Sequence, residues 1–559
     1  MKDSYAKDFI TELRYDLKVK DPIKARYVLN QLDLVDKETQ INAIAALSRA
    51  PGDFVIPLLV EVLAVRPDLA EICPLLKEVL LSKAIFGASD IVSLLEAESN
   101  TAKKIILTEI AGKIRIKEAS PILVKFLNLE KDQILLKHTI KALGMIGDPP
   151  SVSQIAEYLY SWNSELMLTA IHALGRIETP EAFERLAGRL GSDRDVDTII
   201  LEVFSLSQTP EAIEKLTEAL SSRYAHIRNE AKKRLIHIAA KSVPFLLKNL
   251  SVNNSDTLVH TLNALGIIGD ESAILPIRRL LHSEPEDPNV RFAAYEALGS
   301  LPVEKGAITL AEGLEDPESS VRSAAAKVID HNYNPLLSAG IKNLVREGGT
   351  DAEGIIRTFI DSQCDNIFLD LIFEESFSAY AFEYLNRRVH PDIKNYFLSL
   401  LKENGLKDKA SMISKKRTRP EGDVLKVFAV DDSKMILGIY RTVLNNLGCR
   451  PLLFEYPADA LTKLGEEKPD VILTDLNMPD ISGIELTRNV RELYGKEEMP
   501  VIMVTTQNES NDHEEAYKAG VNAIIHKPFN EDQIWKVLTQ FVNLSTDISE
   551  KETKLIQHC

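Results

Sequence analysis

Residues 471–475 of this chain read Val-Ile-Leu-Thr-Asp, a short apolar run that ends in a carboxylate. The run is rich in β-branched residues and does not alternate with polar ones, which is typical of a strand buried on both faces of a parallel sheet. Turn-forming residues bracket it, with Pro469 and Asp470 before it and residues 477–480 after it. Asp475 is therefore expected at the carboxyl end of a strand, where open α/β sheets have their binding crevice.

Other apolar runs accompany this one in the last part of the chain, and segments of helical periodicity separate them. The runs cover residues 427–430, 452–454, 471–473, 501–504 and 523–525. Five βα units of this size predict a doubly wound parallel sheet. The C-terminal part of the chain is therefore expected to form an α/β domain.

Polar residues follow these strands at the same edge of the predicted sheet. Asp431 and Asp432 come after the first strand, and Asp475 comes after the third. Crowded carboxylates repel one another, and a hard divalent cation such as Mg²⁺, which often binds one or two carboxylates beside a phosphate, relieves that repulsion. Thr505 ends the fourth strand and Lys527 ends the fifth. A cation, a hydroxyl and an ammonium around a nucleophilic carboxylate describe phosphoryl transfer to aspartate.

With these residues in these places, segment 424–542 resembles the response-regulator receiver domain, a flavodoxin-like fold. The resemblance implies that Asp475 accepts a phosphoryl group from a histidine kinase or phosphotransfer protein. It implies that Asp432 and Asp475 bind Mg²⁺ directly, together with the backbone carbonyl of Asn477, and that Asp431 supports a metal-bound water. Such a domain catalyses only its own phosphoryl transfer and autodephosphorylation, so the chain is not otherwise expected to be an enzyme.

The same resemblance assigns the phosphoryl oxygens to Thr505 and Lys527, and it implies a cis bond between Lys527 and Pro528. One position departs from the family pattern. Three residues before Lys527 the family usually carries Tyr or Phe, and this chain carries Ile524. We therefore expect the state of the site to be relayed by the backbone of the fourth strand, by residues 507–512 and by the helix that follows.

A repeat with a period of about 30 residues covers the chain from about residue 20 to about residue 335. Its anchors are residues 142–149, 173–177, 264–270 and 297–301. In the unit 274–299, the apolar spacing predicts one helix over 274–281 and a second over 290–298, separated by proline and aspartate. One helix pair cannot bury its own apolar stripe, so the units are expected to stack.

The phrase Val-Arg-x-x-Ala-x-x-Ala-Leu-Gly at residues 290–299 resembles the HEAT-repeat superhelix, in the short variety of phycobilisome-lyase-type proteins. The resemblance covers about 300 residues and implies a curved scaffold for protein binding. The phrase recurs with Arg228, Arg291 and Arg322, which are expected to pack and hydrogen-bond between repeats. Gly299 is expected to end its helix.

The resulting plan has an α-solenoid over residues 1–335 and a helical cap or continuation over 336–405, where aromatic residues replace the glycine phrase. The cap segment is also open to interpretation as a docking surface for the C-terminal domain. A linker is expected over 406–423, the receiver over 424–542 and a tail over 543–559. The tail is too short for a DNA-binding output domain, so the output is expected from the array or from a separate protein.

Bulk composition narrows the choice of partners. The net charge of −17 argues against broad binding of nucleic acid, which needs a concentrated basic surface. The four cysteines have no CxxC spacing, so neither a zinc site nor a disulfide framework is expected. The start of the chain lacks the apolar core of a signal peptide, and the most apolar run, 54–65, is too short to span a bilayer. A cytoplasmic protein without direct membrane insertion is expected.

These observations predict a two-component response regulator whose receiver is joined to a HEAT-repeat scaffold that binds an unidentified protein partner. Two alternatives remain. A constitutive scaffold with a vestigial receiver would bind its partner in the same way whether or not Asp475 is phosphorylated. A bilin lyase-like enzyme would use the same repeats, although Cys73 and Cys364 have no recognisable catalytic surroundings.

Overall fold

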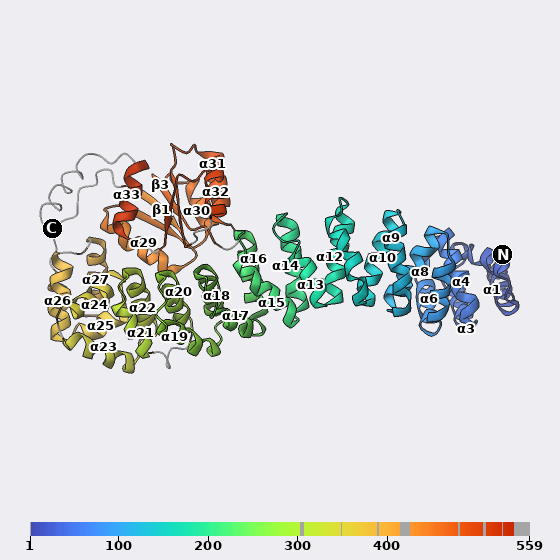
Figure 1. Ribbon diagram of the computed structural model, residues 1–559, viewed down its shortest axis with the longest axis horizontal. Helices are drawn as coiled ribbons and strands as arrows, with labels where there is room; N and C mark the ends of the chain where they lie inside the picture. Colours follow the sequence, from blue (N-terminus) through green and yellow to red (C-terminus); the bar gives the residue numbers. More distant parts are fainter. Residues whose placement is uncertain are drawn as a thin grey trace. The chain divides into compact units, whose positions relative to one another are not determined.

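A computed structural model of the chain divides into two compact units, Met1–Lys215 and Leu216–Cys559, which are described separately (Figure 1). The residues described are 2–301, 307–347, 349–387, 389, 391–413, 425–478, 481–506, 510–527 and 529–541. The predicted tail, most of the predicted linker and Pro528 lie outside these residues.

The first unit is built from helices, and its longer helices α8, α10, α12 and α14 pack against one another in sequence order. The helices are α1 (Lys2–Val19), α2 (Pro22–Leu29), α3 (Lys37–Arg49), α4 (Gly52–Val65), α5 (Leu69–Ile72), α6 (Leu75–Phe86), α7 (Ala88–Ala97), α8 (Thr101–Lys113), α9 (Ser120–Leu129), α10 (Gln133–Ile146), α11 (Val152–Glu157), α12 (Ser164–Ile177), α13 (Pro180–Ala187), α14 (Arg194–Ser207) and the start of α15 (Pro210–Glu218).

The second unit continues the helix pairs and then adds a sheet domain. Its array helices are α16 (Ala225–Ile238), α17 (Val243–Asn249), α18 (Ser255–Ile268), α19 (Ile274–His282), α20 (Pro288–Gly299), α21 (Ala307–Glu312), α22 (Ser319–His331), α23 (Pro335–Glu347), α24 (Gly349–Asp361), α25 (Asp365–Leu371), α26 (Glu375–Arg387), α27 (Pro391–Glu403) and α28 (Lys407–Ser411). Helices α16, α18, α20, α22 and α24 form neighbouring pairs. The two helices predicted for unit 274–299 are α19 and α20, so that prediction is confirmed.

Short polar side chains start the second helix of successive repeats. The carboxylate or amide oxygen accepts a hydrogen bond from a backbone N–H in the first turn at Asp132, Asn163, Asp193, Asn254 and Asp287. These bonds satisfy donors that a helix start otherwise leaves without a partner. These caps fix where α10, α12, α14, α18 and α20 begin.

Glycines in the repeat phrase allow neighbouring helices to touch. A Cβ added to Gly144 would lie 2.6 Å from the Cα of Ala173 in the next inner helix. Gly299 has the same role, since an added Cβ would lie 2.6 Å from Cγ2 of Val328. Helix α20 ends at Gly299, as expected, but Ser300 rather than a left-handed glycine caps it. The left-handed cap is provided elsewhere by glycines such as Gly147, with φ of 73°.

Gly144→Val is expected to destabilise the first unit by at least about 1–3 kcal/mol, because the added side chain must displace main chain of the next helix. Gly147→Asn is the matched control in the same helix, since Asn tolerates the left-handed conformation and open space surrounds Gly147. Thermal unfolding followed by circular dichroism measures both. An unchanged unfolding midpoint for Gly144→Val would contradict the close contact.

One of the three repeat arginines bonds the next repeat, as predicted. Arg291 Nε donates to Asp316 Oδ2 of the next repeat at 2.7 Å. Arg322 Nη1 donates to the Asp316 carbonyl at 2.6 Å and so holds the turn of its own repeat. Arg228 differs, because its guanidinium also contacts the sheet domain.

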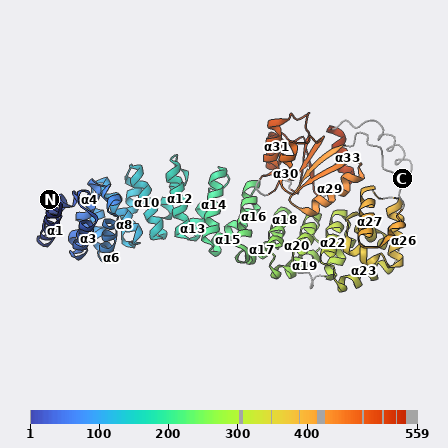
Figure 2. The ribbon, with the colours of Figure 1, turned by 180° about the vertical axis from the view of Figure 1, so that it is seen from behind.

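The sheet domain has five parallel strands in the order β2-β1-β3-β4-β5. Its elements are β1 (Lys426–Val430), α29 (Lys434–Asn446), β2 (Arg450–Phe454), α30 (Pro457–Leu464), β3 (Val471–Thr474), α31 (Gly483–Leu493), β4 (Val501–Thr505), α32 (Ser510–Ala519), β5 (Ala523–His526) and α33 (Glu531–Phe541). Helices α29 and α33 cover one face, and α30, α31 and α32 cover the other (Figure 2). The predicted doubly wound sheet is confirmed.

The segment predicted as a cap packs around aromatic side chains. Phe359, Phe368, Phe377 and Phe397 are fully buried, and the rings of Phe368 and Phe397 lie 4.2 Å apart. This segment also touches the sheet domain, since Thr442 Oγ1 of α29 donates to the carbonyl that ends α24 at 2.9 Å. Both interpretations of the segment therefore describe part of its role.

The predicted linker starts later than expected. Its first residues form helix α28, and the side chains of Ala410 and Ile413 are buried. The basic and polar residues of this stretch indicated a solvated tether. A helix can expose such residues to solvent while a few apolar residues on its other face pack inward. The array therefore extends to about residue 413.

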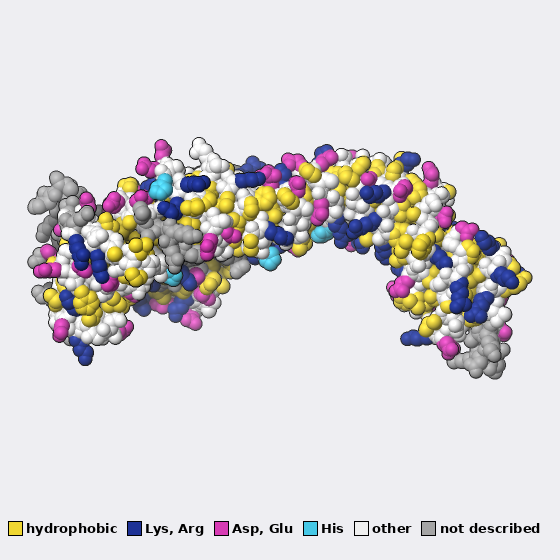
Figure 3. Space-filling view, turned by 90° about the horizontal axis from the view of Figure 1, so that it is seen from below, with side chains coloured by type: hydrophobic (Ala, Val, Ile, Leu, Met, Phe, Trp, Pro, Cys, Tyr) yellow, Lys and Arg dark blue, Asp and Glu magenta, His cyan; other side chains and the backbone are white. Residues whose placement is uncertain are grey.

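Acidic, basic and apolar side chains are interspersed on the face drawn in Figure 3. Within the part of the chain that the structure describes, no helix has the length and apolar content needed to cross a membrane. Cys73, Cys364 and Cys449 are buried free thiols.

Candidate functional site

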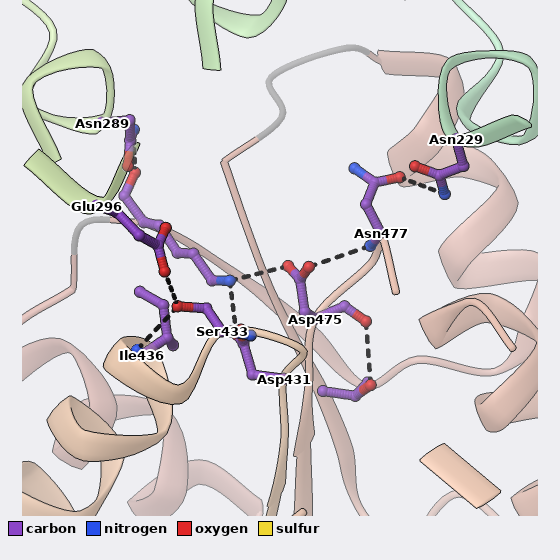
Figure 4. Close-up of polar contacts among 10 residues, drawn as sticks. Asn229, Asn289, Glu296, Asp431, Ser433, Ile436, Asp475 and Asn477 are labelled. Atoms are coloured by element: carbon purple, nitrogen blue, oxygen red, sulfur yellow. Dashed lines mark hydrogen bonds and ion pairs between the residues drawn. The ribbon is translucent and has the colours of Figure 1, made fainter. Parts of the chain in front are cut away.

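Three predicted residues meet at the carboxyl edge of the sheet. The Nζ of Lys527, after β5, lies 2.6 Å from Asp431 Oδ2 and 3.1 Å from Asp475 Oδ1 (Figure 4). Asp431 is 1% exposed, while Asp475 and Lys527 are each 8% exposed. The parallel strands β1, β3 and β5 thus deliver two carboxylates and one ammonium to a single buried cluster.

The main chain fixes the position of Asp475. Its N–H donates to the Val430 carbonyl at 2.9 Å, and its Oδ2 accepts the N–H of Asn477 at 3.2 Å. Gly483, the first residue of α31, packs so closely that an added Cβ would collide with the Asp475 carbonyl. The capping box of Ser482 and Glu485 starts α31 at that point. The Asp475 carboxylate therefore has little freedom to move.

Burial and charge act in opposite directions on these groups. Burial raises the pKa of Asp431, and the ammonium of Lys527 offsets part of that rise. Burial alone would lower the pKa of Lys527, but the carboxylates of Asp431 and Asp475 outweigh it and raise that pKa well above its ordinary value. Lys527 is therefore charged at neutral pH and supplies a fixed positive charge beside Asp475.

Asp432 and Asn477 border the same cavity, which has a volume of about 80 Å³. One water needs roughly 10–15 Å³ of such space, so several waters fit. Thr505 is 1% exposed at the end of β4, and its carbonyl accepts the N–H of Lys527 at 2.8 Å. Its neighbour Thr506 lines the cavity and was not predicted.

The donor set suits a magnesium ion, because carboxylate and carbonyl oxygens are the ligands that it prefers. Asp431, Asp432 and Asp475 all line the cavity, as does Asn477. In the structure, however, the Lys527 ammonium bonds two of these carboxylates. Among the described residues, no group of three or more His, Cys, Asp or Glu side chains is arranged around one metal position. The residues thus fit the ion by chemistry, while Lys527 balances their charge.

Ile524 occupies the position where the receiver resemblance implies an aromatic residue. It is half-buried and packs against an apolar cluster that includes Leu476, Ile484 and Met503. The cluster links the residue after Asp475 to β4 and β5 through aliphatic contacts. Residues 507–509 of the predicted relay lie outside the described residues.

The array also contributes side chains to this edge, which sequence reasoning did not find. Asn229 Nδ2 of α16 donates to Asn477 Oδ1 at 3.1 Å, and Asn289 Nδ2 of α20 donates to the Lys527 carbonyl at 2.6 Å. No motif marks either asparagine, since each occupies a variable position of its repeat. They are recognised only once the two folds are seen together (Figure 4).

Charged contacts accompany these amide contacts. Ser433, the N-cap of α29, donates from Oγ to Glu296 Oε1 of α20 at 2.5 Å. Arg228 Nη2 of α16 donates to Asp512 Oδ2 of α32 at 2.6 Å, and these side chains are 2% and 3% exposed. Arg228 has the same place in its repeat as Arg291, so its different role had no signal in the sequence.

Comparisons with known proteins agree with these two folds. A family model described as the response regulator receiver domain matches residues 427–539, and one described as HEAT repeats matches 131–204 and 243–330. The chemotaxis protein CheY homolog of Campylobacter jejuni is 41% identical over 109 residues, which are 19% of this chain and 82% of that protein. Chemotaxis protein CheY1 of Helicobacter pylori is 37% identical over 107 residues, which are 19% of this chain and 86% of that protein.

Among solved structures, a receiver domain of a sensor histidine kinase from Pseudomonas aeruginosa, with a magnesium ion coordinated in its active site cleft, is 24% identical to this chain. The match covers 21% of this chain and 98% of that one, with a TM-score of 0.20. The segment matched by the receiver family contains Asp431, Asp475 and Lys527, which the fold brings together. The chain therefore belongs to the response regulator receiver family, and HEAT repeats precede its receiver domain.

Proposed function

We propose that this chain is a two-component response regulator that acts in the cytoplasm. Asp475 accepts a phosphoryl group from a phosphohistidine of a partner kinase or phosphotransfer protein, and the HEAT array passes the change to a protein partner. The observation that supports the proposal is the buried trio of Asp431, Asp475 and Lys527, with Lys527 Nζ 3.1 Å from the acceptor carboxylate.

The transfer needs positioning and charge rather than further covalent chemistry. A carboxylate oxygen of Asp475 attacks the phosphorus, an O–P bond forms as the P–N bond breaks, and the electron pair of that bond stays on the imidazole. Lys527 stabilises the charge of the transferred oxygens. Asp432, Asp475 and the backbone carbonyl of Asn477 would hold a magnesium ion, with Asp431 supporting a metal-bound water, and the ion would supply further positive charge.

The chemistry of the chain is confined to this transfer and to hydrolysis of its own acyl phosphate. In the hydrolysis, water attacks the phosphorus, the O–P bond to Asp475 breaks, and inorganic phosphate leaves. Thr505 and Lys527 then serve as phosphoryl ligands, as the receiver resemblance implies. No separate substrate is required.

The test is incubation of the full chain with magnesium and acetyl phosphate, followed by intact-mass measurement. The wild type gains one phosphoryl group, and Asp475→Ala gains none. Asp470→Ala is the matched control, because Asp470 precedes the same strand at its opposite end and is exposed. Equal labelling of Asp475→Ala and the wild type would refute the acceptor assignment. Equal affinity of both states for a partner of the array would favour a constitutive scaffold.

A further inference from the structure

One surface of the array contacts the receiver at the edge of the sheet that carries Asp475. It consists of Arg228, Asn229 and Lys232 on α16, with Asn289 and Glu296 on α20, and is here called the receiver seat. All five residues belong to the same compact unit as the receiver.

The receiver seat bonds segments that follow four of the five strands. It bonds Ser433 after β1, Asn477 after β3 and the Lys527 carbonyl after β5. It also bonds Asp512 in the first turn of α32, which follows β4. The array thus bonds the receiver after β1, β3, β4 and β5, which include the strand of Asp475 and both of its neighbours.

Arg228 and Asp512 form a buried ion pair across this contact. Both side chains are buried, with 2% and 3% exposure, and Nη2 lies 2.6 Å from Oδ2. Loss of one partner of such a pair leaves a charge buried without compensation, which is strongly unfavourable. The docked arrangement therefore depends on this pair.

Lys232 gives the receiver seat a positive charge beside the carboxylates at the acceptor edge, which is the edge of the sheet that carries Asp475. It lines the cavity together with Asp432 and Asp475. Burial raises the pKa of Asp432, and Lys232 is the cation that opposes this rise most. Among the described residues, its ammonium has no ion pair or hydrogen bond. The seat thus presents a cation to the edge that carries the carboxylates.

We propose that the receiver seat is a binding surface for the acceptor edge of this chain's own receiver, and that docking there withholds Asp475 from its phosphodonor. The inference rests on the proposed function. Asp475 is 8% exposed, and array residues, among them Lys232 and Asn289, line the cavity beside it, so a folded partner cannot bring its histidine to this carboxylate while the receiver is docked. The rate of phosphorylation by such a partner is therefore expected to be proportional to the fraction of chains in which the receiver is undocked.

The experiment compares full chains that carry Arg228→Met or Asp512→Asn with the wild type. Each substitution breaks the buried pair from one side, and phosphorylation by a phosphohistidine-bearing phosphotransfer protein is expected to become at least about tenfold faster. The double variant is expected to be accelerated less than either single variant, because it leaves no buried charge without its partner. Hydrogen exchange of residues 431–436, read by mass spectrometry, is expected to become faster in each variant.

Arg322→Met is the matched control, because Arg322 has the same place in its repeat but bonds only the Asp316–Pro317 turn. It is expected to keep the wild-type rate of phosphorylation and of exchange at residues 431–436. Equal rates and equal exchange in the wild type and in the Arg228 and Asp512 variants would overturn the inference alone. Absence of labelling in every chain with acetyl phosphate would refute the proposed function, while faster exchange would still establish docking.

Discussion

Lys527→Ala is expected to slow the phosphorylation of Asp475 by about 100- to 1000-fold, the cost of removing one preorganised charge-stabilising group. The ammonium lies 3.1 Å from the acceptor oxygen and is held there by Asp431. The measurement is the rate of labelling by acetyl phosphate at fixed magnesium. If the variant were slower than the wild type by less than about twofold, far short of the expected loss, Lys527 would have no part in the transfer.

The same substitution is expected to destabilise the receiver, because it leaves Asp431 and Asp475 buried without their cation. Breaking a buried pair in this way costs about 3–5 kcal/mol. Without Lys527, burial keeps the pKa of Asp431 above its unfolded value, so its contribution to stability is present at low pH and is lost as the pH rises. The loss is therefore expected to be larger at pH 8 than at pH 5.

Tryptophan fluorescence measures this effect in the intact chain. Trp535 of α33 is half-buried in the receiver, whereas Trp162 is fully exposed and changes little on unfolding. Denaturant midpoints at the two pH values give the change in stability. Equal losses at both pH values would contradict the electrostatic explanation.

Gly483→Ala is expected to abolish most phosphorylation without touching any side chain of the site. A Cβ at this position would collide with the Asp475 carbonyl and crowd the main chain of Leu476. Either α31 or the acceptor residue must move, and displacements of about 1 Å can cost roughly 100-fold in rate. The readout is the rate of labelling by acetyl phosphate.

Gly438→Ala provides the comparison for this substitution. Gly438 lies in α29 of the same domain, and no atom would come within 4 Å of an added Cβ. Alanine also favours helix by about 1 kcal/mol over glycine, so labelling and stability are expected to be retained. If Gly483→Ala were labelled as fast as Gly438→Ala, the close approach of α31 to Asp475 would not constrain the acceptor.

Much of the receiver could be predicted because its signals are local. Each strand is a short apolar run with turn residues at its ends, and the carboxyl ends of parallel strands converge, which placed Asp431, Asp475 and Lys527 together. The chemistry of those residue types then predicted phosphoryl transfer to Asp475. The metal ligands and the role of Thr505 stay predictions.

The contacts between array and receiver could not be predicted from the sequence. Arg228 and Asp512 are separated by 284 positions, and the repeat phrase around Arg228 is the same one that gives Arg291 an internal role. The contact that Gly299 makes with the next helix was missed for a related reason. A glycine at a helix end and a glycine at a helix contact look alike until the neighbouring helix is in place.

The docked receiver has a mechanical consequence for the array. In a stack of repeats each pair touches mainly its neighbours, so bending and fraying spread step by step. The receiver bonds α16, α20 and the end of α24 at once. It therefore acts as a strut that joins distant repeats, and the segment that it spans is expected to flex and unfold as one piece until the strut detaches.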